Sequence, residues 1–475
     1  MDCMTEPNFL SVNEALHLIQ EGKLSPPTIT RACFNQIEKL NPKLNAFITV
    51  CNDIIVSEDE NSKTKQSTYR EKTASRGFAA ALSGIPIAVK DLFETKGIRT
   101  TAGSKFFTDY IPTEDAVVVK KLKEAGAIIM GKTNTHEIAL GVTTVNPHFG
   151  TCRNPWDLSR IPGGSSGGSA VAVATGMALA ALGTDTGGSI RIPASLCGVT
   201  GFKPTFGRVS VRGVFPLSWN LDHVGPITRT VTDAALILQV IAGYDPDDPY
   251  SINEPVEDFS SGIENGIKDQ RVALAVGEYV ENADPEVLDA LHQAALVFEK
   301  SGAKVENVDM SFLYPAALAN SLMTPADGAA YHHDRLAEHP DWFGEDVRQR
   351  LEMGRSLTST EYVNARRTQS EMKHRLGRFF EQVDLLLLPS TPISAPLIEG
   401  NDAIEQARRL TRFTAPFNLT GLPALSVPCG YTKSGLPIGL QIVSRSWNEA
   451  AVLQAGRAYE RETGWGTHYP PIIQT

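Results

Sequence analysis

The chain has 475 residues, of which 42% are hydrophobic and 21% charged, so a large core is expected and global disorder is excluded. A formal net charge of −10 disfavours a nucleic-acid groove or an anionic membrane surface as the main partner. The six cysteines are scattered without a CxxC pair, which suits a reducing compartment. Because no signal-peptide pattern and no membrane-length apolar run is seen, we expect a cytoplasmic protein.

The N-terminal part of the chain predicts helices that brace a core. Ser11–Glu14 fits a capping box, and an amphipathic helix is expected over Val12–Glu21. A second helix is expected from Pro26 to about Leu40, and a strand over residues 46–50. Residues 58–75 are polar and mixed in charge, so they are interpreted as an exposed surface crossing.

Strands and helices alternate in the next part of the chain. A short apolar strand is expected over Ile85–Val89, and it ends at Lys90. Taken alone, a lysine at a strand end extends to water. Asp115–Ala125 has a helical pattern, and Ala127–Met130 has that of a strand. This alternation is typical of a doubly wound sheet.

Gly131–Glu137 follows that strand and carries several polar groups. We expect His136 and Glu137 to make structural hydrogen bonds, because the HExxH spacing of a metal site is absent. Lys132 is expected to be an ordinary charge at a strand end.

Two glycine-serine turns flank an apolar segment in the middle of the chain. The turns are Gly163-Gly164-Ser165-Ser166-Gly167-Gly168 and Asp185-Thr186-Gly187-Gly188-Ser189. Because Ala170–Leu182 is rich in Ala, Val and Leu and has no charge, we expect it to form one buried helix that fixes both turns. Glycines let backbone N–H groups point into a cavity, where a serine beside them can act as a nucleophile.

Three other interpretations of these turns stay open. A phosphate cradle at a helix N-terminus would need the Lys-Ser/Thr of a P-loop, and no GxGxxG is present. Gly163–Gly167 fits the G-x-S-x-G of a nucleophile elbow, but Arg160-Ile161-Pro162 precedes it instead of a strand. Plain tight turns are common in glycine-rich stretches. The alternative of another class is therefore a non-catalytic phosphate- or nucleotide-binding module.

The run GGSSGG, a small-residue segment and GTDTGGSIR-P resembles the amidase signature family. That family contains stand-alone amidases and the glutamine-hydrolysing subunit of the tRNA-dependent amidotransferase. The resemblance continues over residues 82–245 and 418–444. It implies an α/β fold, a single α/β/α sandwich around a central mixed sheet spanning residues 1–475. Within it, a signature core covers about 82–245 and a variable substrate-funnel region about 310–415. No cofactor and no metal is expected.

The resemblance also implies a Ser–cis-Ser–Lys triad. Its nucleophile matches Ser189, its bridging serine Ser165 and its lysine Lys90, with a cis peptide before Ser165. A neutral Lys90 then takes a proton from Ser165, which takes one from Ser189, and water hydrolyses the acyl-enzyme. The residues expected to bind the oxyanion or substrate are Thr186, Gly187, Gly188, Gly163 and Gly164, and those expected to support the site are Asp185, Arg191 and Ser166.

His223 lies beside Asp222 and invites a Ser-His-Asp interpretation. Adjacent residues do not face each other on a strand or helix, so Asp222 is badly placed to orient the histidine. We therefore disfavour that triad.

The second half of the chain predicts further α/β elements. The expected elements are a helix over 232–242, strands over 271–276 and 305–308, a helix over 285–300, a buried strand over 385–388, a hairpin of 424–427 and 438–443, and a final helix over 448–460. The pattern over Leu313–Phe380 is mostly helical, and His332-His333 within it is expected on a solvated helix face.

The resemblance implies a small-molecule amide or carbamate substrate, no nucleic-acid or membrane partner, and leaves a homodimer open. The amidotransferase relative uses an arginine to hold the substrate α-carboxylate, and the position of this arginine falls at Gln369 in this chain. Arg366 or Arg367 replaces it if the register slips. We expect a stand-alone hydrolase of less polar amides, such as aryl or alkyl amides or carbamates. The glutamine-hydrolysing subunit is the alternative.

Overall fold

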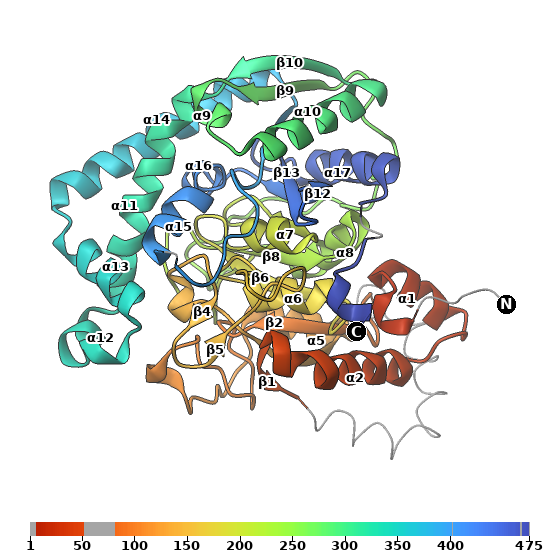
Figure 1. Ribbon diagram of the computed structural model, residues 1–475, viewed down its shortest axis with the longest axis vertical. Coiled ribbons are helices and arrows are strands. Elements are labelled where there is room, and N and C mark those ends of the chain that lie inside the picture. The colour runs from red at the N-terminus through yellow and green to blue at the C-terminus, as the bar shows by residue number, and fades with distance from the viewer. Residues whose placement is uncertain (1–5, 52–80, 401, 466–467, 475) are drawn as a thin grey trace.

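The computed structural model describes residues 6–51, 81–400, 402–465 and 468–474. The expected surface crossing at residues 58–75 lies outside these ranges. Figure 1 shows a sheet that runs through the molecule with helices on both sides, and four of these helices, α11 to α14, gather at one side.

Within the described ranges, eleven strands form one mixed sheet in the order β1-β3-β2-β6-β8-β7-β12-β13-β11-β9-β10. Strands β2 and β3, β2 and β6, β11 and β9, and β9 and β10 run parallel, and the other neighbouring pairs are antiparallel. The strands are β1 Phe47–Val50, β2 Pro86–Lys90, β3 Ile128–Thr133, β6 Ala180–Asp185, β7 Thr200–Lys203, β8 His223–Thr228, β9 Arg271–Val276, β10 Lys304–Asp309, β11 Leu385–Pro389, β12 Ala424–Tyr431 and β13 Pro437–Val443, and a separate pair is β4 Val145–Asn146 and β5 Gly150–Thr151. The expected central mixed sheet is confirmed.

The helices fill the intervals between these strands. They are α1 Val12–Gln20, α2 Pro26–Leu44, α5 Val117–Glu124, α6 Gly167–Ala174, α7 Arg191–Cys197, α8 Val231–Ile241, α9 Glu278–Glu281, α10 Pro285–Lys300, α11 Tyr314–Tyr331, α12 His333–Glu338, α13 Glu345–Ser356, α14 Ser359–Gln382, α15 Ala403–Leu410, α16 Ala415–Thr420 and α17 Glu449–Thr463. The helical pattern predicted over Leu313–Phe380 is confirmed as α11 to α14.

The expected single helix over Ala170–Leu182 is wrong. Helix α6 ends at Ala174, and β6 begins at Ala180, in the middle of the sheet. Gly176, with a φ of 71°, lies between them, a left-handed conformation that interrupts a helix. Both halves are fully buried. A continuous apolar run cannot by its pattern distinguish a buried helix from a buried strand.

Most local patterns are confirmed with small shifts at the ends. The Ser11 side chain and the Glu14 side chain form the predicted capping box at the start of α1. Helix α2 continues past the expected end at Leu40 to Leu44, with Pro42 inside its last turn. Strand β11 is buried throughout between the parallel β9 and the antiparallel β13. The hairpin of β12 and β13 forms as predicted.

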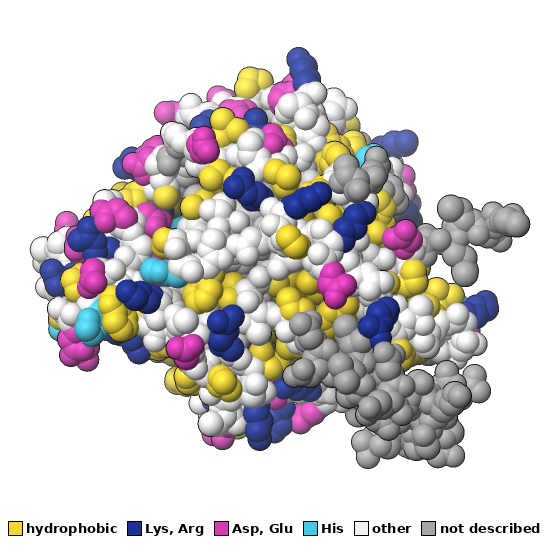
Figure 2. Space-filling view, turned by 60° about the horizontal axis from the view of Figure 1, so that its bottom comes forward, with side chains coloured by type: hydrophobic (Ala, Val, Ile, Leu, Met, Phe, Trp, Pro, Cys, Tyr) yellow, Lys and Arg dark blue, Asp and Glu magenta, His cyan; other side chains and the backbone are white. Residues whose placement is uncertain are grey.

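The surface carries both charge signs. On the face seen in Figure 2, basic and acidic side chains are interspersed without one large area of a single sign. Among the helices that the structure describes, none is long and apolar enough to cross a membrane.

Candidate active site

Lys90 ends β2 and is completely buried. Its Nζ lies 2.7 Å from Oγ of Ser165 and 2.7 Å from Oγ1 of Thr184. Burial lowers the pKa of Lys90 to about 7, although the carboxylates of Asp185 and Asp222 favour the charged form. Near neutral pH a substantial fraction of this amine is therefore uncharged. A lysine that extends to water is excluded at this strand end.

The first glycine-serine turn carries Ser165 to the lysine. The peptide bond between Gly164 and Ser165 is cis, as predicted. The Gly163 carbonyl accepts a hydrogen bond from Thr144 Oγ1 at 2.7 Å. The Ser166 hydroxyl donates to the Thr184 carbonyl at 3.1 Å and accepts from the Thr184 N–H at 3.3 Å. Through these two hydrogen bonds, Ser166 connects the first turn to the end of β6.

The second turn follows β6 and is held by a buried ion pair. Arg191 Nη2 lies 2.9 Å from Asp185 Oδ1, and its Nε lies 3.0 Å from Oδ2. Arg191 also donates to the side-chain oxygens of Asn418 and Gln441. Burial by itself would raise the pKa of Asp185, but the charge of Arg191 and these hydrogen bonds hold it below its ordinary value. As predicted, this pair ties loops together by hydrogen bonds.

Three backbone N–H groups of the second turn have no hydrogen-bond acceptor among the residues that the structure describes. In the described part of the chain, no acceptor is found for the N–H of Gly187, Gly188 or Ser189. Buried N–H groups are normally paired. Three consecutive donors without partners form an oxyanion-binding arrangement if a ligand oxygen meets them.

The two turns lie side by side. The Ser166 N–H donates to the Ser189 carbonyl at 3.2 Å, which brings Ser189 next to the cis peptide. The Ser189 side chain makes no hydrogen bond to any residue in the described ranges. A direct link between the Ser165 and Ser189 hydroxyls therefore stays a prediction.

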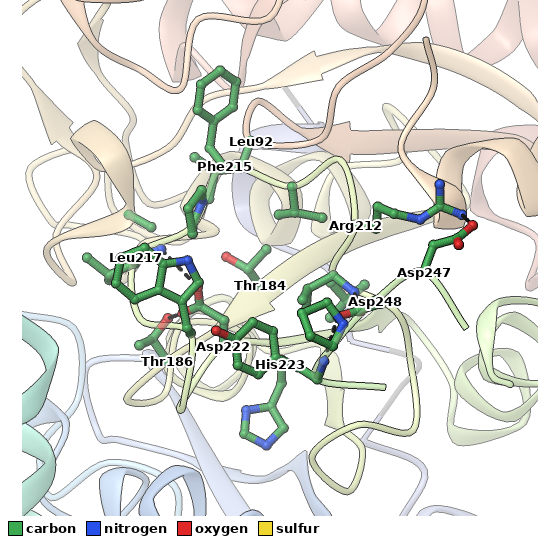
Figure 3. Close-up of a pocket in the computed structure, with 18 residues that line it drawn as sticks. Leu92, Thr184, Thr186, Arg212, Phe215, Leu217, Asp222, His223, Asp247 and Asp248 are labelled. Carbon is green, nitrogen blue, oxygen red and sulfur yellow. Dashed lines mark hydrogen bonds and ion pairs between the residues drawn. The ribbon is translucent and has the colours of Figure 1, made fainter. Parts of the chain in front are cut away.

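A cavity borders the same end of β6 and is mostly apolar. Figure 3 shows Leu92, Phe215 and Leu217 around it, with Thr184 and Thr186 reaching it from the β6 side. Thr186 Oγ1 donates to Oδ1 of Asp222 at 2.5 Å. The Leu217 and Ser218 amides donate to Oδ2 of Asp222.

Asp222 borders this cavity and has a raised pKa. Burial raises its pKa to about 6, and the hydrogen bond from Thr186 opposes that rise. All its hydrogen bonds come from groups other than His223, whose Nδ1 approaches the Leu221 and Asp185 carbonyls instead. Figure 3 shows the His223 ring pointing away from the Asp222 carboxylate. The disfavoured Ser-His-Asp triad is therefore not assembled.

His136 and Glu137 make the structural hydrogen bonds predicted for them. His136 Nε2 lies 2.9 Å from Asp346 Oδ2, in α13. Glu137 accepts from the Ser104 hydroxyl and from the Gly344 N–H. Among the described residues, no group of three or more His, Cys, Asp or Glu side chains is placed to hold a metal ion.

The expectation for Lys132 is wrong. Its side chain is fully buried, and Nζ donates to the Phe93 carbonyl and to Oγ1 of Thr95 and Thr100. Asp91 Oδ1 lies 3.8 Å from the same nitrogen. The lysine is buried because β3 lies inside the sheet between β1 and β2, which the local pattern does not reveal.

Two expectations in the helical region have different outcomes. His332 is only 2% exposed, so it does not lie on the solvated helix face that was predicted, whereas His333 is exposed. Arg366 donates to Gln369 Oε1 at 2.6 Å, and Gln369 is buried and donates to the Leu419 carbonyl. Arg367 pairs with Glu371 on the surface.

Some members of the site were not identified from the sequence. Lys90 Nζ donates to Thr184 as well as to Ser165, and the signal that could have identified Thr184 is its position at the end of a buried strand, just before the second turn. Asn320 and Thr414 hydrogen-bond the carbonyls of the second turn. No local pattern marks these two residues, because they are far from the turn in the chain.

The chain is similar to known proteins over nearly its whole length. The Amidase family model matches residues 28–453. A glutamyl-tRNA(Gln) amidotransferase subunit from Geobacter sp. (strain M21) is 37% identical over 490 residues, covering 98% of this chain and 99% of that protein.

Two solved structures extend the comparison. The first is the inhibitor-bound form of a vestigial protein complex related to the origins of an s-triazine catabolic enzyme, with a TM-score of 0.87, 33% identity, and coverage of 96% of this chain and 99% of the other. The second is a bacterial aryl acylamidase, with a TM-score of 0.86, 28% identity, and coverage of 98% of both chains. With a buried lysine, two serine turns and this extent of similarity, the chain belongs to the amidase signature family of hydrolases that cleave amide C–N bonds.

Proposed function

We propose that the protein hydrolyses carboxylic amides through an acyl-enzyme formed on Ser189. The observation that carries the proposal is the buried Lys90 amine at 2.7 Å from the Ser165 hydroxyl, in the turn that contacts the backbone of Ser189. A poor electrophile such as an amide requires an activated hydroxyl, stabilisation of the developing O⁻ and a proton for the departing nitrogen. These residues supply all three.

In the proposed reaction the Ser189 oxygen attacks the carbonyl carbon and breaks its π bond. The Ser189 proton passes to Ser165, whose own proton passes to the neutral Lys90 amine. The N–H groups of Gly187 and Gly188 hold the oxyanion, and one such donor lowers the barrier by about 3–4 kcal/mol. The C–N bond then breaks, and the relay returns a proton to the leaving amine. Water attacks the acyl-enzyme by the same relay and releases the acid.

The pKa of Lys90 supports this role. A base works best when its pKa lies close to the working pH, and that of Lys90 is about 7. The two hydroxyl partners of the amine, Ser165 and Thr184, are neutral, so neither holds the amine in its charged form.

We further propose a stand-alone hydrolase of less polar amides, including aryl or alkyl amides and carbamates. The mostly apolar walls of the cavity beside Thr184 and Thr186 support a small, weakly polar substrate. Gln369, at the position where the amidotransferase relative is expected to have a carboxylate-binding arginine, is buried and bonded to Leu419. Arg366, its neighbour on α14, is exposed.

A second candidate is the glutamine-hydrolysing subunit of a tRNA-dependent amidotransferase. The 37% identity to a protein of that name over 98% of the chain favours it. It would bind further subunits, whereas the stand-alone hydrolase would act alone or as a homodimer. Activity on free glutamine, raised by partner subunits, is the result that would support this second candidate.

The first experiment compares Ser189→Ala with the natural protein. Turnover of an anilide and labelling by a fluorophosphonate should both be abolished in the variant, while the thermal midpoint stays within a few degrees. His223→Ala serves as the matched control, because its ring approaches the Leu221 and Asp185 carbonyls and leads to neither serine. An equally inactive His223→Ala protein that folds normally would overturn the lysine mechanism. Tight phosphate binding without turnover or labelling would instead favour the phosphate-binding module.

The second experiment assays one panel of anilides, primary amides, carbamates and glutamine with the purified protein. We expect the anilides or carbamates to give the highest kcat/KM. Glutamine as the best substrate would reverse the order of the two candidates.

A further inference from the structure

Two carbonyl groups of the second turn accept hydrogen bonds from side chains that are far away in the chain. Asn320 lies in α11, and its Nδ2 donates to the Thr186 carbonyl at 3.1 Å. Thr414 precedes α16, and its Oγ1 donates to the Gly187 carbonyl at 2.6 Å. Both side chains are buried, with 3% and 0% of their surfaces exposed. Two successive peptide planes of the turn are thus fixed from outside the turn.

Peptide geometry converts these two hydrogen bonds into an orientation of donors. The C=O and N–H of one planar trans peptide point in opposite directions. Because the Thr186 carbonyl points at Asn320, the Gly187 N–H points away from Asn320. The same relation makes the Gly188 N–H point away from Thr414. These are two of the N–H groups for which no acceptor is found in the described part of the chain.

The side chains of Asn320 and Thr414 lie close to the two glycines of the turn. A Cβ atom on Gly187 would lie 3.2 Å from Asn320 Oδ1, and one on Gly188 would overlap Thr414 Oγ1. Asn320 and Thr414 therefore leave no room for a larger residue at Gly188 and little room at Gly187. Thr414 is itself fixed, because its carbonyl accepts from Arg191 Nη1 at 3.0 Å. The Arg191–Asp185 pair and the two carbonyl contacts form one continuous support.

We propose that Asn320 and Thr414 are positioning residues that orient the Gly187 and Gly188 N–H groups toward the oxyanion. The inference rests on the proposed function, in which those groups stabilise the charge on the carbonyl oxygen. Both residues lie in the region 310–415, which the family resemblance associates with the substrate funnel, so the proposal gives this region a direct effect on the chemical step. Preorganised donors act mainly in the transition state, so their loss lowers kcat more than it raises KM.

The test uses Thr414→Val, which keeps the shape of the side chain but removes the hydroxyl, and Asn320→Ala. Each should lower kcat by about tenfold with KM changed less than twofold, and the double variant by about a hundredfold, below the full loss of a donor. The rate of fluorophosphonate labelling at Ser189 should fall in parallel. Thr414→Ser, which keeps the hydroxyl, should restore most of kcat.

The matched control is Thr420→Val in α16. Its hydroxyl also donates to a backbone carbonyl, that of Pro416, at 2.7 Å, but this hydrogen bond lies within its own helix. We expect its kcat to stay within twofold of the natural protein. If Thr414→Val fails to fold, Asn320→Ala alone still measures the loss of one carbonyl contact, with Thr420→Val as its control.

Three outcomes distinguish a failure of the positioning role from a failure of the proposed function. An inactive Ser189→Ala protein together with an unchanged kcat in the Asn320→Ala/Thr414→Val double variant would overturn the positioning role and leave the proposed function intact. An increase of KM alone would also overturn it, since that result indicates a contact to the substrate. An active Ser189→Ala protein would overturn the proposed function itself.

Discussion

Two buried lysines on neighbouring strands have similar surroundings and different partners. Lys90 ends β2 and Lys132 lies one residue before the end of β3, and the two strands are parallel and hydrogen-bonded. Burial lowers the pKa of Lys90 to about 7 and that of Lys132 to about 8. Lys90 contacts two hydroxyls, whereas Lys132 contacts a carbonyl, two hydroxyls and the carboxylate of Asp91.

A lowered pKa is therefore not sufficient to make a buried lysine a general base. The Lys132 amine donates hydrogen bonds to the acceptors around it, and none of these acceptors is a candidate nucleophile. Lys90 contacts Ser165, whose turn lies against Ser189. A buried amine serves catalysis when one of its partners can exchange a proton with the reacting group.

The largest effect is expected for Lys90→Met. The substitution removes the proposed base and keeps an apolar side chain in the strand, so kcat/KM should fall about a thousandfold or more while the fold persists. Steady-state kinetics on an anilide, together with a thermal melt, measure both quantities. A variant that keeps a tenth of the natural activity would contradict the role of Lys90.

The next largest effect is expected for Lys132→Met, which should lower the free energy of unfolding. The variant leaves the Asp91 carboxylate buried without its cation, which costs about 3–5 kcal/mol. Urea unfolding measures the loss, and the folded fraction should still be labelled at Ser189. The double variant Lys132→Met/Asp91→Asn should regain part of the stability. Loss of labelling in folded Lys132→Met protein would erase the distinction between the two lysines.

The pH dependence of kcat/KM tests whether Lys90 is the group that titrates. If Lys90 is the base proposed above, its neutral form reacts, so with a pKa of about 7 kcat/KM should rise about tenfold per pH unit below 7 and level off above it. Asp222→Asn removes a negative charge that favours the ammonium form, so the midpoint should move to lower pH. A profile whose midpoint is unmoved in Asp222→Asn would count against Lys90 as the titrating group.

The smallest effect is expected for Thr184→Val. This variant removes one of the two hydroxyl partners of Lys90, which costs about 1 kcal/mol and lowers kcat roughly fivefold. Thr100→Val removes an equivalent partner of Lys132 and should lower stability by about 1 kcal/mol with kcat unchanged. If Thr184→Val and Thr100→Val lowered kcat equally, the contrast drawn here between Lys90 and Lys132 would be wrong.

Much of the fold follows from local patterns. Strand β9 and helix α10 have the bounds predicted, because a short continuous apolar run and an amphipathic face are properties of a few consecutive residues. The capping box at Ser11 needs only four residues and is present. The apolar run over Ala170–Leu182 misled, because a segment buried on every side has no polar face to reveal its period.

The resemblance to the amidase signature family identified Lys90, Ser165 and Ser189 and the nearby glycines as candidates, because the run GGSSGG … GTDTGGSIR-P is long and specific. The packing of distant elements settles which buried lysine contacts a serine and which carbonyls accept from Asn320 and Thr414. Burial and hydrogen-bond partners depend on the order in which strands and helices pack. Since that order joins residues far apart in the chain, no local pattern contains it.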